Sequence, residues 1–128
     1  MGDILALDIG EKRIGVARAN MVAKLPEALP YIDNDSKVAD SIKNLIDRYG
    51  VSRMVIGLPR NLNGQETKQS EYTKQFVDKA IPKGIQVIWQ DETLSSYRAK
   101  VITGKTKNVD SEAACVILND FLEDYHEI

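Results

Sequence analysis

The chain has 128 residues, which is the length of one domain: enough for one sheet with helices packed on it, and too short for two lobes that close over a nucleotide. Apolar residues make up 43% and charged residues 28%, as in ordinary globular proteins, and no apolar run approaches the roughly 18 residues of a membrane span. The first ten residues, MGDILALDIG, lack the basic start of a signal peptide, and the single cysteine excludes an internal disulfide. We therefore expect a cytoplasmic protein.

The net charge is −2 and the pI is about 5.4, whereas nucleic-acid-binding domains usually carry a basic excess. The charges are nevertheless uneven. Four cations and no acid lie between Arg98 and Lys107, and four acids without Lys or Arg lie between Asp120 and Glu127. The first run is either a local basic strip or an ordinary solvated face, and the pattern alone favours the solvated face.

The N-terminal third predicts three extended segments. Ile4–Ile9 and Ile14–Ala19 are apolar runs separated by a short polar turn, which indicates a β-hairpin. A third segment at Ala28–Ile32 is broken by Pro26 and Pro30, so we expect it to be irregular or to lie at a sheet edge.

The rest of the chain alternates helices and strands. The predicted elements are a turn and capping cluster at Asp33–Ser36, a helix from Val38 to Tyr49 ended by Gly50, a strand at Arg53–Gly57, a loop at Leu58–Gly64, a helix at Glu66–Ile81, a strand at Ile85–Trp89, a short helix at Ser95–Ile102, a polar loop at Gly104–Asn108, and a last helix capped by Asp110 or Ser111. This order predicts an α/β fold with a mixed five-stranded sheet. An antiparallel meander comes first, two parallel strands follow, and helices cover both faces.

Asp8 is the most informative candidate for chemistry. It interrupts an apolar strand near its C-terminal end, where a charge is costly to bury unless it is paired or binds a cation. Gly10 follows two residues later, so the backbone can turn there and leave room for a phosphate. The alternative is that Asp8 only caps the hairpin turn.

Two further acids lie at element ends. Glu92 comes directly after the strand predicted to end at Trp89, and ligands of α/β sheets bind beyond the carboxyl ends of parallel strands. Since neighbouring residues of an extended chain point to opposite sides, Asp91 should face away if Glu92 faces the site. Asp110 begins the last helix, where Asp is also a favoured cap.

A cluster of Asp8, Glu92 and Asp110 would point to divalent-metal chemistry. Converging carboxylates repel one another, and a cation such as Mg²⁺, which prefers carboxylate and water ligands, relieves that repulsion. Such a site can orient water for displacement at a phosphate. Zinc chemistry is not expected, because His126 lies near the chain end and Cys115 lies inside a helix.

Four segments carry a resemblance to the YqgF family, also called RuvX: LDIGEKRIGVA from Leu7, VIGLP from Val55 with the downstream Gly64, DETL from Asp91, and VDSEAACVIL from Val109. They occur in family order and cover nearly the whole chain. The family comprises small bacterial RNase H-like proteins described as pre-16S ribosomal RNA nucleases and as Holliday-junction-resolvase-like. The resemblance implies an RNase H-like fold.

The resemblance also implies a function and a site. We expect one RNase H-like nuclease domain over residues 1–128, acting as a metal-dependent endonuclease with Mg²⁺ or Mn²⁺ held by Asp8, Glu92 and Asp110. Pre-ribosomal RNA is the expected substrate and branched DNA the alternative, with no membrane contact and a monomer or weak homodimer. The predicted substrate-binding residues are Lys12, Arg13, Asn61 and Arg98, with Lys100, Lys105 and Lys107 as candidates beside the substrate path; surface solubility is the alternative reading for these cations.

The sequence departs from the family pattern at several positions. Thr93 replaces the usual Arg after Asp-Glu, which puts a phosphate contact in question, and Ser95 and Ser96 replace threonines. Asn20 stands where Asp is common. None of these changes removes one of the three acids.

Three other functions compete with the nuclease. A four-way DNA junction resolvase needs two active sites and therefore a dimer. A non-catalytic nucleic-acid-binding or assembly module would fit the acidic pI and Thr93. A sugar-kinase or actin-like ATPase also begins with Asp-x-Gly and a hairpin, but those proteins are longer than this chain.

Overall fold

A computed structural model describes residues 2–60, 63, 65–93 and 109–124. Its elements are strands β1 (Ile4–Ile9), β2 (Arg13–Ala19) and β3 (Glu27–Asp33), helix α1 (Val38–Tyr49), strand β4 (Arg53–Arg60), helix α2 (Lys68–Ala80), strand β5 (Gln86–Thr93) and helix α4 (Val109–Asp124). The predicted short helix at Ser95–Ile102 and loop at Gly104–Asn108 lie outside the described residues.

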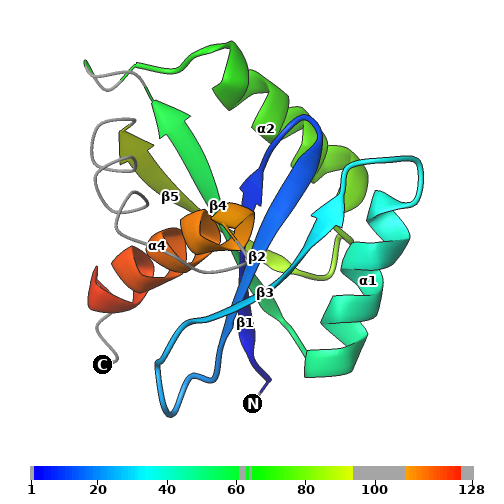
Figure 1. The fold of residues 1–128 in the computed structure, drawn as a ribbon, viewed down its shortest axis with the longest axis vertical. Coiled ribbons are helices and arrows are strands. Elements are labelled where there is room, and N and C mark those ends of the chain that lie inside the picture. The colour runs from blue at the N-terminus through cyan, green and yellow to red at the C-terminus, as the bar shows by residue number, and fades with distance from the viewer. Residues whose placement is uncertain (1, 61–62, 64, 94–108, 125–128) are drawn as a thin grey trace.

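The five strands form one sheet in the order β3-β2-β1-β4-β5 (Figure 1). β1, β2 and β3 form an antiparallel meander, and β4 and β5 lie parallel to β1. The predicted mixed sheet is confirmed, including the edge position of β3. Because β1, β4 and β5 run in the same direction, their carboxyl ends point to the same end of the molecule.

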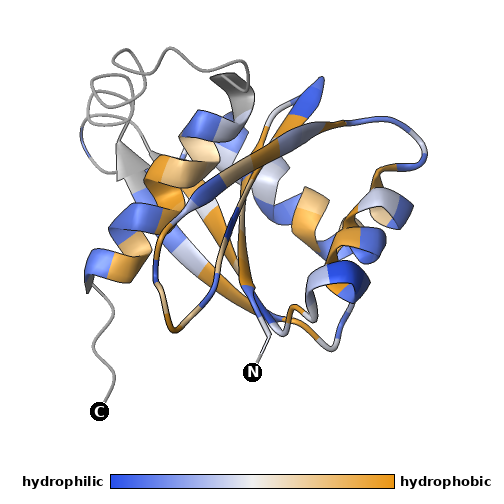
Figure 2. Cartoon of the chain, turned by 60° about the horizontal axis from the view of Figure 1, so that its bottom comes forward, coloured by the Kyte–Doolittle hydropathy of each residue, from blue (hydrophilic) through white to orange (hydrophobic). Residues whose placement is uncertain are grey.

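Helices cover both faces of the sheet and create two hydrophobic clusters. One lies under α1 and α2 and includes Leu7, Ile56 and Phe76. The other lies under α4 and includes Val55 and Ile117. Figure 2 shows hydrophobic residues along the strands and along the side of α4 that meets the sheet. Because side chains alternate along each strand, successive residues lie on opposite faces and pack in different clusters.

Both parallel strands are longer than the sequence predicts. β4 continues through Leu58 and Pro59 to Arg60, where a loop was expected, and β5 continues to Thr93. β1 pairs with β4 only as far as Ile56, so Pro59 lies where β4 has no neighbour on the β1 side and a missing N–H is tolerated. Asp91 and Glu92 therefore belong to the strand rather than following it.

α1 has the predicted bounds, Val38–Tyr49, and Gly50 ends it with φ 62°. Its N-cap residue, Lys37, makes no side-chain cap, but Asp35 Oδ1 accepts from the Lys37 N–H at 2.9 Å and the Asp35 carbonyl accepts from the Val38 N–H at 3.2 Å, so the predicted turn and capping cluster is confirmed at Asp35. The other two helices begin elsewhere than predicted. α2 begins two residues later than predicted, after Thr67. α4 is described from Val109, so Asp110 and Ser111 lie within its first turn rather than before it.

Within the described residues, no helix combines the length and the apolar character needed to cross a membrane.

Candidate functional site at the carboxyl ends of the parallel strands

Asp8 lies on the sheet face that α4 covers. Its neighbours Leu7 and Ile9 both belong to the cluster under α1 and α2, so alternation places position 8 on the opposite face. Its partner on β2 is Gly15, which has no side chain to fill the space beside the carboxylate. Asp8 is only partly buried, so solvent reaches this end of the strand.

The turn that follows Asp8 is held by its own backbone and by two amide side chains. The Gly10 N–H donates to the Arg13 carbonyl at 3.1 Å, and a Cβ on Gly10 would lie 2.6 Å from that oxygen, so the position needs glycine. Asn34 Nδ2 donates to the Gly10 carbonyl at 2.8 Å, and Gln69 Nε2 donates to the Ile9 carbonyl at 3.0 Å. Segments from β3–α1 and α2 thus fix the backbone beside Asp8.

The end of β4 is tied to the start of α2. The Ser70 hydroxyl donates to the Pro59 carbonyl, and Ser70 also completes a capping box with Thr67. Ser70 is fully buried, and the hydrogen bond to Pro59 is partly buried. Because Pro59 is the register partner of Glu92, the same contact positions the strand pair that carries Glu92.

Position 92 falls on the same sheet face as position 8. On β5, Val87 packs against the cluster under α1 and α2, and Ile88 packs against the cluster under α4. Alternation therefore assigns position 92 to the α4 face and Asp91 to the other face. The Glu92 side chain itself lies outside the described residues.

The N-terminal turn of α4 is anchored to the sheet next to Asp8. Ser111 is fully buried, and its Oγ accepts a hydrogen bond from the Val16 N–H at 3.1 Å. Val16 lies where the pairing of β2 with β3 shifts register, and it follows Gly15, the partner of Asp8. The backbone of Asp110 is therefore brought to this part of the sheet, while its side chain lies outside the described residues.

These backbone positions place three carboxylate-bearing residues on one face and at one end of the sheet. The donor set contains oxygen ligands and no His or Cys, which fits a hard cation such as Mg²⁺ or Mn²⁺. Among the residues whose side chains are described, no group of three possible metal ligands occurs. That set omits the side chains of Glu92 and Asp110.

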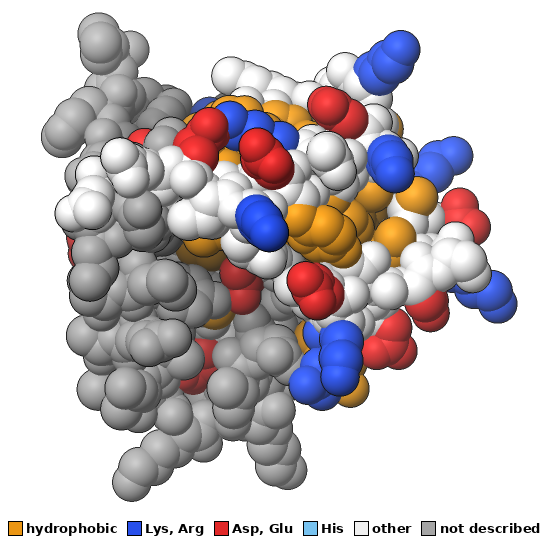
Figure 3. All heavy atoms as spheres, turned by 90° about the horizontal axis from the view of Figure 1, so that it is seen from above, with side chains coloured by type: hydrophobic (Ala, Val, Ile, Leu, Met, Phe, Trp, Pro, Cys, Tyr) orange, Lys and Arg blue, Asp and Glu red, His pale blue; other side chains and the backbone are white. Residues whose placement is uncertain are grey.

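The predicted substrate cations are described only in part. Lys12 is exposed in the hairpin turn and Arg13 is exposed at the start of β2. The others, Asn61, Arg98, Lys100, Lys105 and Lys107, lie outside the described residues. Figure 3 looks onto the end of the molecule toward which β1, β4 and β5 run, and there the described Lys and Arg side chains are interspersed with acids. They do not gather into one basic patch.

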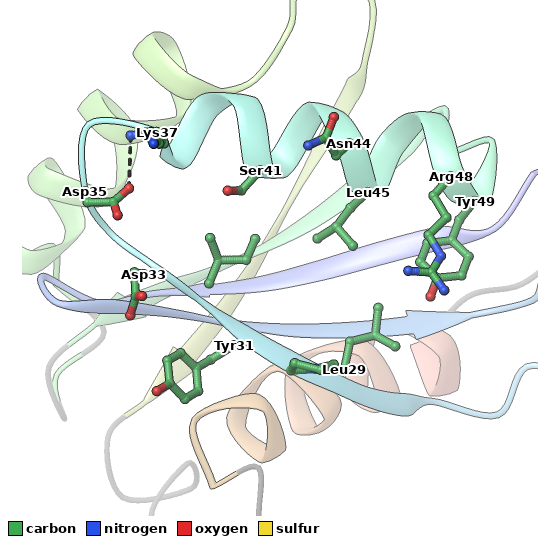
Figure 4. A pocket seen from close by; sticks show the side chains of 12 residues that line it. Leu29, Tyr31, Asp33, Asp35, Lys37, Ser41, Asn44, Leu45, Arg48 and Tyr49 are labelled. Carbon is green, nitrogen blue, oxygen red and sulfur yellow. Dashed lines mark hydrogen bonds between the residues drawn. The ribbon is translucent and has the colours of Figure 1, made fainter.

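One described hollow lies away from these acids. It has a volume of about 490 Å³ and is lined by β3 and α1, including Leu29, Leu45 and Tyr49 (Figure 4). Since Leu29 belongs to the cluster under α1 and α2, this hollow lies on the sheet face opposite Asp8.

Sequence reasoning missed the residues that support the site. From sequence, Ser111 is a possible cap, Asn34 belongs to a turn, and Gln69 falls inside a predicted helix without any distinguishing feature. Each acts on a backbone group more than 20 residues away along the chain, with sequence separations of 95, 24 and 60. Contacts between residues this far apart along the chain cannot be predicted from a local sequence pattern.

Comparison with known proteins identifies close relatives. The family model described as "RuvX: Holliday junction resolvase" matches residues 2–124. A Sulfurihydrogenibium protein named "Putative pre-16S rRNA nuclease" is 42% identical over 96% of this chain and 91% of its own length. A Ralstonia pickettii protein of the same name is 34% identical over 97% of this chain and 89% of its own.

Solved structures share the fold at low sequence identity. Thermus thermophilus RuvC in complex with a Holliday junction substrate aligns with a TM-score of 0.54 at 6% identity, covering 95% of this chain and 94% of that one. Fowlpox virus resolvase with Holliday junction DNA gives 0.54 at 13% identity, covering 94% and 97%. The fold is therefore RNase H-like, as the resemblance implied, and the family match over almost the whole chain shows that this protein belongs to the RuvX family.

Proposed function

We propose that this protein is a metal-dependent endonuclease that hydrolyses phosphodiester bonds, with Asp8, Glu92 and Asp110 as the residues that hold Mg²⁺ or Mn²⁺. The observation that carries the proposal is the strand register. Leu7 pairs with Ile56 and Pro59 pairs with Glu92, so positions 8 and 92 share one face at the end where three parallel strands finish. Membership of a family of nucleases and resolvases supports the same reaction.

In the proposed reaction, the protein holds the segments that carry the metal-binding carboxylates in a fixed arrangement. A divalent cation, when bound, supplies the positive charge that stabilises the phosphorane-like transition state and helps to deprotonate the attacking water. Asp8 sits on a strand whose following turn is fixed by hydrogen bonds from Asn34 and Gln69, so the backbone that carries its carboxylate is held in place before substrate arrives. The hydrogen bond to Ser111 holds the first turn of α4, and with it the backbone of Asp110.

The proposed substrate is precursor 16S ribosomal RNA, cut in the cytoplasm. The support is the name shared by relatives between 31% and 42% identical over more than nine-tenths of this chain. Thr93, which stands where the family usually has Arg, removes one cation from the expected phosphate contacts. We therefore expect Thr93→Arg to lower KM for RNA without changing the metal requirement.

The deciding experiment compares cleavage of labelled single-stranded RNA and of junction DNA by wild type and by Asp8→Ala, with Mn²⁺ and with chelator. The proposal predicts RNA cutting that needs metal and is lost in Asp8→Ala. Full metal-dependent cutting by a well-folded Asp8→Ala would overturn the assignment of Asp8.

Junction resolution is the second candidate, favoured by the family model's description and by the shared fold. A resolvase must present two active sites to its substrate and so must dimerise. Preferential cutting of junction DNA, together with a dimer at working concentration in sedimentation, would replace RNA by branched DNA as the substrate.

A further inference from the structure

An exposed aromatic side chain and an arginine are stacked on the α4 face of the sheet, beside the end of β1 that carries Asp8. The Arg13 guanidinium carbon lies 5.2 Å from the centre of the Tyr31 ring, within cation–π distance. Tyr31 is 44% exposed and Arg13 is also exposed. We call these two residues the Tyr31–Arg13 platform.

Both residues of the platform face the same side as Asp8. Arg13 precedes Ile14, which belongs to the cluster under α1 and α2, so alternation puts Arg13 on the α4 face. On β3 the register shifts by one residue, so that Pro30 and Tyr31 together lie opposite Gly15, the partner of Asp8. The contact with Arg13 and the direction of the ring in Figure 4, from β3 away from α1, place Tyr31 on the same side, although it also borders the hollow between β3 and α1.

The platform is close to the proposed catalytic carboxylates. β3 is two strands away from β1 in the sheet, and neighbouring strands lie about 4.8 Å apart, which gives a lateral separation of roughly 10 Å. A nucleic-acid strand with one phosphate at Asp8 would therefore pass over Tyr31 if it left the site across β2 and β3.

The chemistry of the platform matches a nucleobase with its phosphate. Bases of single strands stack on exposed aromatic rings and on the planes of arginine guanidinium groups. Arg13 lies over one face of the Tyr31 ring, so a base would stack on the exposed remainder of the ring or on the guanidinium plane, with the Arg13 charge beside the phosphate. Asp33 is the register partner of Arg13 and disfavours a second phosphate at the β3 edge. Bases in a duplex are already stacked on their neighbours, so a ring of this kind selects an unpaired strand.

We propose that the Tyr31–Arg13 platform is a single-strand binding site, on which an unpaired base of the substrate stacks while the nearby phosphate is cut. The proposal rests on the proposed nuclease function for its biological meaning. Stacking of an unpaired base on Tyr31 is a binding event, so it can be tested without cleavage.

The test measures binding in chelator, so that no strand is cut. The probes are a short labelled oligouridylate, the abasic ribose-phosphate strand of the same length, and a duplex RNA. Wild type should bind the oligouridylate more tightly than either of the others. Tyr31→Ala should weaken oligouridylate binding by roughly 5-fold to 150-fold, the range for loss of one stacked base, and should leave abasic binding unchanged.

Matched variants separate stacking from other effects. Tyr31→Trp should keep or tighten oligouridylate binding, because it preserves the aromatic face. Trp89→Ala removes another exposed aromatic, on β5 and on the other sheet face by alternation, and should leave binding unchanged. Asp33→Asn should tighten binding to both single strands through reduced repulsion.

Three outcomes would overturn the platform: equal binding of oligouridylate by wild type and Tyr31→Ala, equal losses by Tyr31→Ala on the oligouridylate and abasic strands, or no binding of oligouridylate by wild type. None of these depends on metal or on Asp8. If wild type binds the oligouridylate through Tyr31 but does not cleave RNA with metal, the nuclease proposal is rejected and the binding site is retained.

Discussion

The backbone N–H of Val16 donates to the hydroxyl oxygen of Ser111 at 3.1 Å, which joins β2 to the first turn of α4 across 95 residues of sequence. Val16 follows the register partner of Asp8, and Ser111 follows Asp110. This contact therefore holds the turn of α4 that carries Asp110 against β2, the strand paired with the one that carries Asp8.

Ser111→Ala should destabilise the protein and misplace Asp110. The substitution leaves the buried Val16 N–H without its acceptor, which costs about 1–3 kcal/mol in the free energy of unfolding measured with urea. If the contact positions Asp110, kcat should fall with little change in KM under conditions where the variant is fully folded. Ser36→Ala, at an exposed serine, is the control; equal stability of Ser111→Ala and this control would show that the hydrogen bond contributes nothing.

Gly57→Ala should push α4 away from the sheet. A Cβ at this position would lie 2.4 Å from Ile117 Cδ1, in a fully packed region where overpacking typically costs about 1–3 kcal/mol. Gly84→Ala is the matched control, since nothing lies within 4 Å of its Cβ. Removing Cδ1 with Ile117→Val should make the double variant more stable than the sum of the two single changes predicts; simple additivity would contradict the contact.

Asn34→Asp should loosen the turn beside Asp8 while preserving the shape of the side chain. The amide now donates to the Gly10 carbonyl at 2.8 Å, and a carboxylate can only repel that oxygen. We expect a lower unfolding temperature and reduced kcat. Asn34 also donates to the Tyr72 hydroxyl at 2.7 Å, so Tyr72→Phe is the control that removes this second contact alone. If Tyr72→Phe reproduces the whole effect, the turn contact is not the cause.

Cys115 should be unreactive in the folded protein. Burial raises the pKa of its thiol from 9.0 to about 11, with a smaller contribution from Glu112, and only the thiolate reacts readily. Because the folded thiol keeps its proton to higher pH than the unfolded thiol, this group's contribution to stability is complete below pH 9 and is lost as the pH rises through about 11. Alkylation with iodoacetamide near neutral pH should be much slower in native than in urea-unfolded protein; equal rates would contradict the burial.

The sequence was sufficient to predict the mixed sheet, because apolar runs mark its strands and the order of helices and strands indicates how they pair. Apolar runs marked β1 and β2, and Pro26 and Pro30 correctly indicated an edge at β3. The ends of β4 and β5 could not be predicted in the same way. The residues Leu58-Pro59-Arg60 resemble a loop, and only the structure shows that β4 pairs with β1 as far as Ile56 and with β5 as far as Arg60.

The three acids could be selected as candidates from sequence, but their supports could not. Asp8 stands out because it is charged within a buried strand, a signal present in the residues themselves. Ser111, Asn34 and Gln69 are recognisable only from the backbone groups that they contact. The Tyr31–Arg13 platform likewise depends on the pairing of β2 with β3. The register of that pairing shifts by one residue between Ile14 and Val16, and the sequence does not show this shift.

The most direct measurement of the central claim is titration of Mn²⁺ into wild type and into Asp8→Asn, Glu92→Gln, Asp110→Asn and Asp91→Asn, with binding followed by calorimetry. Each of the first three variants removes one charge with almost no change in shape, and each should weaken Mn²⁺ binding by at least about tenfold. Asp91→Asn changes the neighbouring acid, which alternation places on the other face of β5, and should bind Mn²⁺ like wild type. Mn²⁺ binding that survives in Asp8→Asn, or that is lost in Asp91→Asn alone, would contradict the proposed metal site.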